Sequence, residues 1–485
     1  MHIAILRKQP TMTSIDKAPP AVPLVQQIRD SIAGEIDRGV LLPGAKLESV
    51  RGAALRRNVS TMTVTNAYNR LVAEGYLVAK RASGYFVTSD PSRSSALQRG
   101  RPFVGRTKVD SLWLIRRVWE EGDSALINAG CGWMPPDWLQ GDEVRTALAG
   151  LARKKSAGLT NYGGPSGYLP LRQQIQILLG QRAIDVAAHQ ITLTHGATQG
   201  LALAARTLLR PQDAVLVDDP GSTNLFATLR SMDVRLVGVE RRLDGPDLVA
   251  LEALAKRYKP KAFFICTQLH NPTGGLCSPA VAYQILRLAE KYDFQIVEND
   301  VLAGFEPAGA VTLASLDQLK RVIYIGSFSK TISPSLRVGY LACSEDLAER
   351  IIYEKMVDSL TSSELGEKLV HAVLVGGHYR AHLNTLAERL REAQRVVCDG
   401  LEEAGLQVFV RPAGGPFLSA RFVDERIDVL DVAQQAVAAG IMLAPGYLFR
   451  TDQQPTPWMR FNAGYANNPR LFEFLRAVSG RRGRA

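Results

Sequence analysis

The chain has 485 residues, 46% hydrophobic and 22% charged, an ordinary globular composition that excludes a collagenous or mainly disordered chain. Apolar runs such as 262–266 and 322–326 stop after about five residues, far short of the ~20 that a membrane-spanning helix needs. The N-terminus lacks a secretory signal pattern, so we expect a cytoplasmic protein with no membrane partner. The five cysteines include no C-x-x-C pair, which favours neither a disulfide framework nor a metal site.

The formal net charge of +11 is concentrated near the N-terminus. Residues 1–110 contain 17 Lys and Arg against 8 Asp and Glu, a balance of +9. Residues 111–485 contain 41 against 39, a balance of only +2. This asymmetry indicates a polyanionic partner for the first part of the chain, although a solvated basic surface has the same composition.

The N-terminal segments predict short helices followed by a hairpin. Residues 1–20 show no periodicity and are expected to form a flexible arm. Apolar residues then recur every four positions from Leu24 to Ile36 and stop at Gly39, which predicts an amphipathic helix that ends at a glycine.

Two further helices and a hairpin are expected before residue 89. Ser49 is positioned to cap a short helix, and Ser60 to cap a longer one that ends at Gly75. The strand-like segments 76–80 and 84–88 flank a short polar turn, which is typical of a hairpin. Three helices and a hairpin in this order describe a winged helix-turn-helix domain over residues 21–88.

In such a domain the third helix reads base edges in the major groove of double-stranded DNA, and basic residues around it contact phosphates. The exposed side of the predicted third helix offers short polar groups and one methionine: Thr61, Met62, Thr63, Thr65, Asn66 and Asn69. The candidate phosphate contacts on the preceding helix and the wing are Arg51, Arg56, Arg57, Lys80 and Arg81.

The segment 23–87 resembles the DNA-binding domain of GntR-type bacterial regulators. In that family the arginine matching Arg51, the residues that open the recognition helix, and the wing glycine matching Gly84 touch DNA. The helix-opening residues here are Ser60, Thr61 and Thr63. The chain departs from the family by carrying Thr61 where arginine is usual and Glu48 where proline is usual, so the resemblance does not imply an operator sequence.

A polar, basic segment over 89–110 predicts a flexible linker, and a second domain is expected over 111–485. In that domain strand-like and helix-like segments alternate, which is typical of a large, mostly parallel α/β sheet. The predicted strands are 191–194, 214–219, 262–267, 295–299 and 321–326. The predicted helices include one from Ala197, one over Thr223–Ser231 and one over Pro279–Tyr292.

A lysine at the end of a buried strand is the first sign of covalent chemistry. Lys330 follows the strand 321–326 in a Ser-x-x-Lys turn, and Arg337 lies seven residues further on. A buried lysine is costly unless it is paired or used, and its chemical use is a Schiff base with a carbonyl. Ser327 and Arg337 would supply phosphate ligands beside it, whereas the alternative is an ordinary surface lysine.

Three other segments carry complementary groups at strand ends. Gly196, Ala197 and Thr198 open a helix and let backbone N–H groups approach a phosphate. Asn271 is an amide donor after another strand, and Asp300 is a carboxylate that would keep a pyridine nitrogen protonated. Each feature alone is also explained by a common turn or helix cap. Together they match the requirements of pyridoxal 5′-phosphate (PLP).

Residues 128–485 resemble fold-type I aminotransferases, and the resemblance implies roles for individual residues. Lys330 matches the Schiff-base lysine and Asp300 the pyridinium partner, the two catalytic positions. Asn271 matches the ligand of the ring O3′ atom. The phosphate ligands implied by the resemblance are Gly196, Ala197, Thr198, Ser327 and Arg337.

The same resemblance implies a substrate contact and a contact between subunits. Arg460 matches the arginine that binds a substrate carboxylate, and Tyr162 the tyrosine donated across a dimer. Ser222 stands where the family has an aromatic residue stacked on the ring, although Phe226 lies nearby in sequence. Leu302 stands where relatives have a tyrosine near O3′, which weakens the case for efficient turnover.

The whole chain resembles the MocR (GabR-like) regulators, in which a GntR-type winged helix-turn-helix precedes a fold-type I aminotransferase-like domain with a smaller C-terminal α/β subdomain. The resemblance implies a head-to-tail homodimer that binds PLP and promoter DNA and senses an amino compound or PLP itself. An active aminotransferase with an added DNA-binding domain is one alternative. A binding module whose large domain only dimerises is another.

Overall fold

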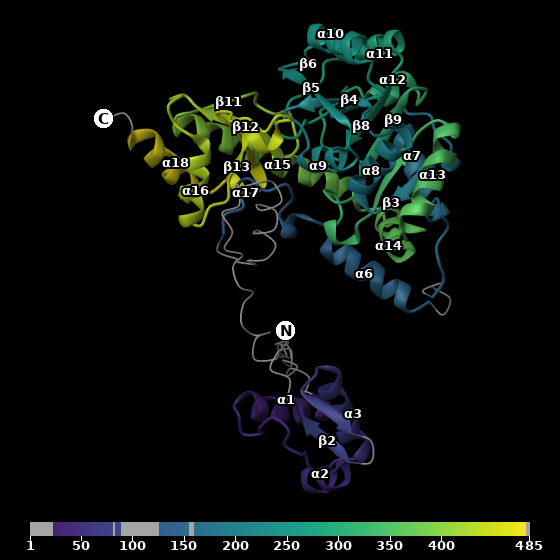
Figure 1. The fold of residues 1–485 in the computed structure, drawn as a ribbon, viewed down its shortest axis with the longest axis vertical. Helices are drawn as coiled ribbons and strands as arrows, with labels where there is room; N and C mark the ends of the chain where they lie inside the picture. Colours follow the sequence, from purple (N-terminus) through teal and green to yellow (C-terminus); the bar gives the residue numbers. More distant parts are fainter. Residues whose placement is uncertain (1–22, 81–82, 89–125, 155–159, 482–485) are drawn as a thin grey trace, which may run out of the picture. The chain divides into compact units, whose positions relative to one another are not determined.

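The computed structural model describes residues 23–80, 83–88, 126–154 and 160–481. The chain divides into two compact units, Met1–Arg106 and Thr107–Ala485, which are described separately (Figure 1). The arm predicted over 1–20 and the linker predicted over 89–110 lie outside the described residues. Among the described residues no helix combines the length and hydrophobicity needed to cross a membrane.

The N-terminal unit has three helices followed by a two-stranded antiparallel sheet. Its elements are α1 (Leu24–Asp37), α2 (Val50–Arg57), α3 (Thr61–Ala73), β1 (Leu77–Lys80) and β2 (Gly84–Val87). The buried faces of the helices pack into one apolar cluster that includes Ile28, Ile32, Val64 and Leu71. The helical periodicity seen in the sequence therefore buries one stripe of each helix, and the unit is a winged helix-turn-helix.

Side-chain caps define where α2 and α3 begin. The Ser49 hydroxyl accepts a hydrogen bond from the Gly52 N–H at 3.1 Å. The Ser60 hydroxyl accepts one from the Thr63 N–H, also at 3.1 Å. Asn58 ends α2 in the left-handed conformation with φ of 50°, as a short polar residue can do. These contacts hold the turn between the two helices.

The hairpin packs against α3. Lys80 pairs with Gly84 across the turn, and Gly84 has a φ of +102°, which favours glycine. The Tyr85 ring makes an edge contact with the Tyr68 ring, with centroids 5.0 Å apart. The Tyr85 hydroxyl donates to the Asn69 side-chain oxygen at 3.1 Å. These contacts position the wing beside the third helix.

The second unit is built around an eight-stranded sheet in the order β3-β10-β9-β8-β7-β4-β5-β6. The strands are β3 (Ile191–Thr194), β4 (Ala214–Asp219), β5 (Arg235–Arg242), β6 (Gly245–Pro246), β7 (Ala262–Ile265), β8 (Gln295–Asp300), β9 (Val322–Ser327) and β10 (Gly339–Ala342). The neighbours β5, β4, β7, β8 and β9 run parallel, while β10 is antiparallel to both β9 and β3. β3 therefore points the same way as the parallel strands, and its C-terminal end lies at the same edge.

Helices cover both faces of this sheet, as the alternation of strands and helices predicts (Figure 1). One face packs against α7 (Leu169–Gly180), α10 (Leu248–Tyr258), α11 (Pro279–Tyr292), α12 (Leu313–Asp317) and α14 (Glu364–Val375). The other face packs against α8 (Gly196–Leu208), α9 (Thr223–Ser231) and α13 (Glu345–Ser359). A further helix, α6 (Gly141–Ala152), contacts α14.

A smaller C-terminal subdomain has an antiparallel sheet in the order β11-β12-β14-β13. Its strands are β11 (Leu406–Val408), β12 (Phe417–Phe422), β13 (Ala444–Pro445) and β14 (Trp458–Asn462). Its helices are α15 (Tyr379–Glu403), α16 (Val429–Ala438), α17 (Ala463–Ala466) and α18 (Pro469–Arg481). These elements share their own apolar cluster, so the predicted division into a mostly parallel central sheet and a smaller α/β part is confirmed.

One strand ends earlier than the sequence predicts. β7 stops at Ile265, two residues before the end of the predicted segment 262–267. The reason is that the Cys266 N–H donates to the Asp218 carboxylate at 2.8 Å instead of continuing the strand ladder. This turn carries the chain toward Asn271.

Candidate functional site

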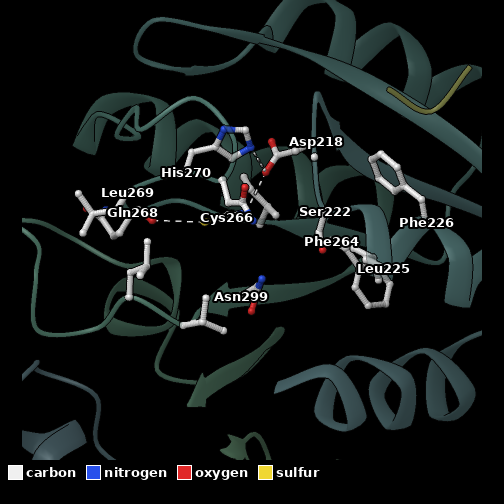
Figure 2. A pocket seen from close by; sticks show the side chains of 15 residues that line it. Asp218, Ser222, Leu225, Phe226, Phe264, Cys266, Gln268, Leu269, His270 and Asn299 are labelled. Carbon is white, nitrogen blue, oxygen red and sulfur yellow. Dashed lines mark hydrogen bonds and ion pairs between the residues drawn. The ribbon is translucent and has the colours of Figure 1, made fainter. Parts of the chain in front are cut away.

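A pocket opens at the edge where the parallel strands end. Ser222, Phe226, Asn271, Asn299 and Leu302 are among the residues that line it. Figure 2 shows the side chains around the pocket, among them Asn299, which belongs to β8. Strand ends of an open parallel sheet are the usual place for a ligand, because the loops there diverge.

Lys330 lies beyond the end of β9, as the sequence predicts. Its ammonium donates a hydrogen bond to the carbonyl of Gly132. Burial lowers the pKa of Lys330 to about 8, and the positive charges of Arg460 and Arg337 act in the same direction. A larger share of the amine is therefore neutral near physiological pH, which is the form that attacks a carbonyl.

Arg460 projects from β14 and meets the pocket through Asn271. One guanidinium nitrogen donates to the Asn271 side-chain oxygen at 3.0 Å, and another donates to the Gly130 carbonyl at 2.7 Å. The guanidinium also lies 5.0 Å from the Phe417 ring centroid and 4.6 Å from that of Phe449. Burial lowers the pKa of Arg460 to about 10. These contacts hold a cation with bidentate geometry for a carboxylate.

The predicted phosphate turn forms at the start of α8. Gly196 has a φ of +73°, and a Cβ there would lie 2.8 Å from an Arg337 nitrogen, so a side chain would collide with the guanidinium. Arg337 donates to the His195 carbonyl at 3.2 Å. Ala197 is half-buried and Thr198 exposed in the first turn of the helix. A helix N-terminus next to a guanidinium is suited to a phosphate.

Ser327 ends β9 on the chain segment that leads to Lys330. Its hydroxyl accepts a hydrogen bond from the Ser329 N–H at 3.2 Å and keeps its own proton for donation. The role of Ser327 as a phosphate ligand stays a prediction.

The assignment of Asp300 as the pyridinium partner requires correction. Asp300 is buried and does not line the pocket. Its carboxylate accepts hydrogen bonds from Arg182 at 2.6 Å and from the Tyr324 hydroxyl at 2.8 Å. Arg182 also forms an ion pair with Glu306. Because neighbouring side chains on a strand face opposite sides, the residue of β8 that faces the pocket is Asn299.

Burial and Arg182 act in opposite directions on Asp300. Burial raises the pKa of Asp300, and the Arg182 guanidinium lowers it. The ion pair places one negative charge against a fixed positive charge on the far side of the strand. Asp300 is therefore a structural partner of Arg182 rather than a catalytic group.

Of the remaining predicted positions of the large unit, some line the pocket of the single chain and one does not. Tyr162 is 82% exposed and does not line the pocket, so its contact stays a prediction that involves a second chain. Ser222 and Leu302 line the pocket at the positions where aromatic residues were expected in relatives. Phe226 also lines it, from α9.

The N-terminal unit presents most of the predicted DNA-contacting residues on its surface. Arg51, Thr61, Lys80 and Gly84 are exposed, and Ser60 caps the recognition helix. The Lys80 ammonium lies 4.8 Å from the centroid of the Phe86 ring.

The structure limits two of the other predicted contacts. The Thr63 hydroxyl already forms a hydrogen bond with the Ser60 hydroxyl, at 2.8 Å. Arg56 forms an ion pair with Glu48, so part of its charge is compensated within the unit. Arg81 lies outside the described residues.

Sequence reasoning missed Asn299 and the two aromatic rings that flank Arg460. Strand alternation over 295–300 puts Asn299 on the same side as Val297 and opposite Asp300, but it does not indicate which side faces the pocket. The contacts with Phe417 and Phe449 join distant segments and have no local signature.

The two units combine a regulator-type helix-turn-helix with a domain of aminotransferase fold. Residues 24–87 match the family of bacterial regulatory proteins called gntR, and residues 136–476 match the family Aminotransferase class I and II. The chain belongs to the aminotransferase class I and II family and carries a GntR-type DNA-binding domain at its N-terminus. The arrangement is consistent with the MocR (GabR-like) group of regulators.

Several curated relatives match this chain over most of their own length. The uncharacterized HTH-type transcriptional regulator YdcR of Escherichia coli is 24% identical over 91% of this chain and 95% of its own. The HTH-type transcriptional regulator NorG of Staphylococcus aureus is 24% identical over 84% of this chain and 93% of its own. A 2-aminoadipate transaminase of Thermus thermophilus is 29% identical over 60% of this chain and 74% of its own.

Solved structures support the fold of the large unit. The α-aminoadipate aminotransferase LysN of Thermus thermophilus superposes with a TM-score of 0.69, covering 76% of this chain and 95% of its own at 24% identity. A multiple substrate aminotransferase of Thermococcus profundus gives a TM-score of 0.68 at 22% identity, covering 77% of this chain and 93% of its own.

The fold implies PLP as the cofactor, and the residues present fit this group. Gly196 and Arg337 form a cradle for an anion that a larger residue at 196 would fill. Lys330 offers an amine and Asn271 an amide near the pocket. Among the described residues the Asn299 side-chain oxygen and one Asp300 carboxylate oxygen are buried without a hydrogen-bond partner, and of the two residues only Asn299 lines the pocket.

Proposed function

We propose that this chain is a PLP-binding transcription regulator that senses an amino compound through its large unit and binds promoter DNA through its N-terminal unit. The observation that carries the proposal is the pairing of a winged helix-turn-helix with a site beside the pocket, where Arg460 contacts the lining residue Asn271 and lies close enough to Lys330 for their charges to interact. A buried amine with a lowered pKa beside a carboxylate-binding guanidinium suits an amino acid or a related ligand.

Each residue has a distinct task in this proposal. PLP supplies an aldehyde that bonds reversibly with amines and can withdraw electrons from them. Gly196 and Arg337 bind the phosphate, and Asn271 orients the ring. Arg460 binds the carboxylate of the amino compound, while Lys330 provides the neutral amine that competes with it.

The partners follow from the same reasoning. Double-stranded promoter DNA with paired half-sites requires two winged domains, so we propose a head-to-tail homodimer. Such a dimer would also give the exposed Tyr162 a neighbouring pocket to enter. We further propose that the protein acts in the cytoplasm, where promoter DNA, PLP and amino acids are available.

An active aminotransferase is the alternative function. The geometry that favours it is the same pair, Lys330 and Arg460, because both groups are needed for transamination as well as for sensing. The alternative predicts steady release of a keto acid and no effect of amines on DNA affinity. The two functions are therefore separable by measurement.

The test titrates full-length protein with amino acids while recording visible absorbance, keto-acid release and promoter affinity. We expect the ligand that changes the absorbance to change the promoter affinity without continuous keto-acid release. A ligand that binds one arrangement of the protein a hundredfold more tightly than the other would change the free-energy difference between the two arrangements by about 2.7 kcal/mol. Lys330→Ala should abolish the response and leave basal DNA binding intact. Steady keto-acid production with no change in DNA affinity would contradict the regulator function.

A further inference from the structure

Asn299 occupies the position from which a side chain reaches the pocket at the end of β8. Asn299 lines the pocket together with Ser222, Asn271 and Leu302, while Asp300 points to the opposite face of the sheet. Figure 2 shows Asn299 and Ser222 among the side chains that line the pocket. The site thus has an amide where a carboxylate would be needed to stabilise a positively charged ring nitrogen.

Among the described residues that line this pocket, Asp218 is the only one with a carboxylate, and that carboxylate is already paired. Asp218 lines the same pocket, but its oxygens accept from the Cys266 N–H at 2.8 Å and from Arg241 at 3.3 Å. Its third neighbour is His270, whose ring nitrogen lies 3.6 Å away. Burial lowers the pKa of His270 well below its usual value, so Arg241 is the charged partner of Asp218.

Three cations also lie near this site. Lys330, Arg337 and Arg460 are close enough for Arg337 and Arg460 to lower the pKa of the lysine. Like charges disfavour a further positive charge on a neighbouring ring. The Asn299 amide is neutral whichever of its two ends faces the ring, because its oxygen and nitrogen differ only in accepting or donating a hydrogen bond.

We propose that Asn299 faces the pyridine nitrogen of bound PLP and leaves that nitrogen unprotonated at neutral pH. The inference rests on the proposed function and deepens it. An unprotonated ring withdraws electrons less strongly than a protonated one, so the cofactor still exchanges amines but does not efficiently activate the Cα–H bond. Asn299 is then the residue that separates amine sensing from turnover in this chain.

Ser222 and Leu302 support the same conclusion from other sides of the pocket. Neither side chain has an aromatic ring to stack on the cofactor, and Leu302 has no hydroxyl to donate to it. The pocket therefore recognises the ring through amides and shape rather than through charge. This pattern fits reversible binding better than catalysis.

The test uses full-length protein loaded with PLP that carries nitrogen-15 in the ring, and records the ring-nitrogen chemical shift at neutral pH. We expect wild-type protein to give the shift of an unprotonated ring. Asn299→Asp should move the signal to the protonated range, because it adds a carboxylate of the same size. Asn299→Ala should keep the signal in the unprotonated range.

Asp300→Asn is the matched control, since it makes the reverse exchange one residue away on the opposite face of β8. We expect its ring-nitrogen shift to equal that of the wild type. A protonated ring in wild-type protein, or an unchanged signal in Asn299→Asp, would overturn the inference while leaving PLP binding established. Failure of wild-type protein to bind PLP at all would instead overturn the proposed function on which the inference rests.

Discussion

Lys330 is the residue whose environment departs most clearly from that of an exposed lysine. The pKa of its amine falls from 10.5 to about 8, mainly because burial penalises the charged form. The positive charges of Arg460 and Arg337 add to this effect. The neutral amine that reacts with an aldehyde is therefore available two pH units or so earlier than in free lysine.

This shift predicts the pH dependence of cofactor attachment. The rate at which PLP bonds to the apoprotein should rise as the pH increases through about 8, where Lys330 loses its proton, and level off above it. Stopped-flow absorbance would measure the rate, and borohydride reduction followed by peptide mapping should find the label on Lys330. A label on another lysine would contradict the assignment.

Asp300 illustrates how a strand residue next to the pocket serves stability. Its side chain is 1% exposed and that of Arg182 is 18% exposed, so their ion pair is largely shielded from water. Removing one partner of such a pair leaves the other charge buried, which typically costs about 3–5 kcal/mol.

We therefore expect Asp300→Asn to lower the free energy of unfolding by about 3 kcal/mol, partly offset by the remaining pair between Arg182 and Glu306. Chemical denaturation would measure the change, while visible absorbance should show PLP bound normally. Asp293→Asn is the control, because Asp293 pairs with Arg321 but is 88% exposed, and its loss should cost less than about 1 kcal/mol. Equal effects of the two substitutions would contradict this view of Asp300.

At the level of elements, the recognition helix α3 depends on its N-cap residue, Ser60. Ser60 caps α3 and binds the Thr63 hydroxyl, so it holds the end of the helix that enters the groove. Arg51 lies on the exposed side of α2, where a backbone contact rather than a base contact is expected. Arg51 and Thr61, the exposed first residue of α3, should therefore affect DNA binding in different ways.

Arg51→Ala should weaken binding to all duplexes by a similar factor and reduce the slope of log affinity against log salt by about 0.9, the loss of one phosphate contact. Thr61→Ala should mainly change the preference among sites, because a base edge rather than a phosphate loses its partner. Fluorescence anisotropy at several salt concentrations would measure both. Arg287→Ala, an exposed arginine of the large unit, is the control and should leave the salt slope unchanged.

At the scale of the whole molecule, charge and chemistry are divided between the two units. Residues 1–110 carry a balance of +9 and residues 111–485 one of +2, so the electrostatic attraction to DNA is concentrated in the first unit. Each unit also has its own apolar core, since the buried clusters of the large unit include no residue of the winged domain. The proposed binding of DNA and of an amino compound should therefore be separable.

A chain that lacks residues 1–110 should fold, bind PLP and respond to amines by absorbance, because its cores and pocket are complete. Its promoter affinity should fall to the background level of an unrelated protein. Gel-shift and absorbance titrations of the same preparation would test both statements. Tight promoter binding by the shortened chain would show that this division is wrong.

The features that depend on local spacing can be predicted from the amino-acid sequence alone. The caps Ser49 and Ser60 and the positions of β8 and β9 follow from turn chemistry and hydrophobic periodicity, which act within a few residues. The position of Lys330 after a buried strand can also be predicted from the local sequence. Because strand ends meet at one edge of a parallel sheet, their grouping into one site was also predictable.

Which of the two neighbours on β8 faces the pocket depends instead on tertiary contacts. Successive side chains of a strand point to opposite faces of the sheet, so Asn299 and Asp300 would exchange faces if the strand were shifted by one residue. The local sequence does not distinguish these two orientations. The choice is made by distant residues: Arg182 and Tyr324 bind Asp300 on one face, and Arg460 reaches Asn271 from the C-terminal subdomain on the other side of the site. Contacts of that kind join segments more than a hundred residues apart, or a strand to its neighbour in the sheet, and exist only once the chain has folded.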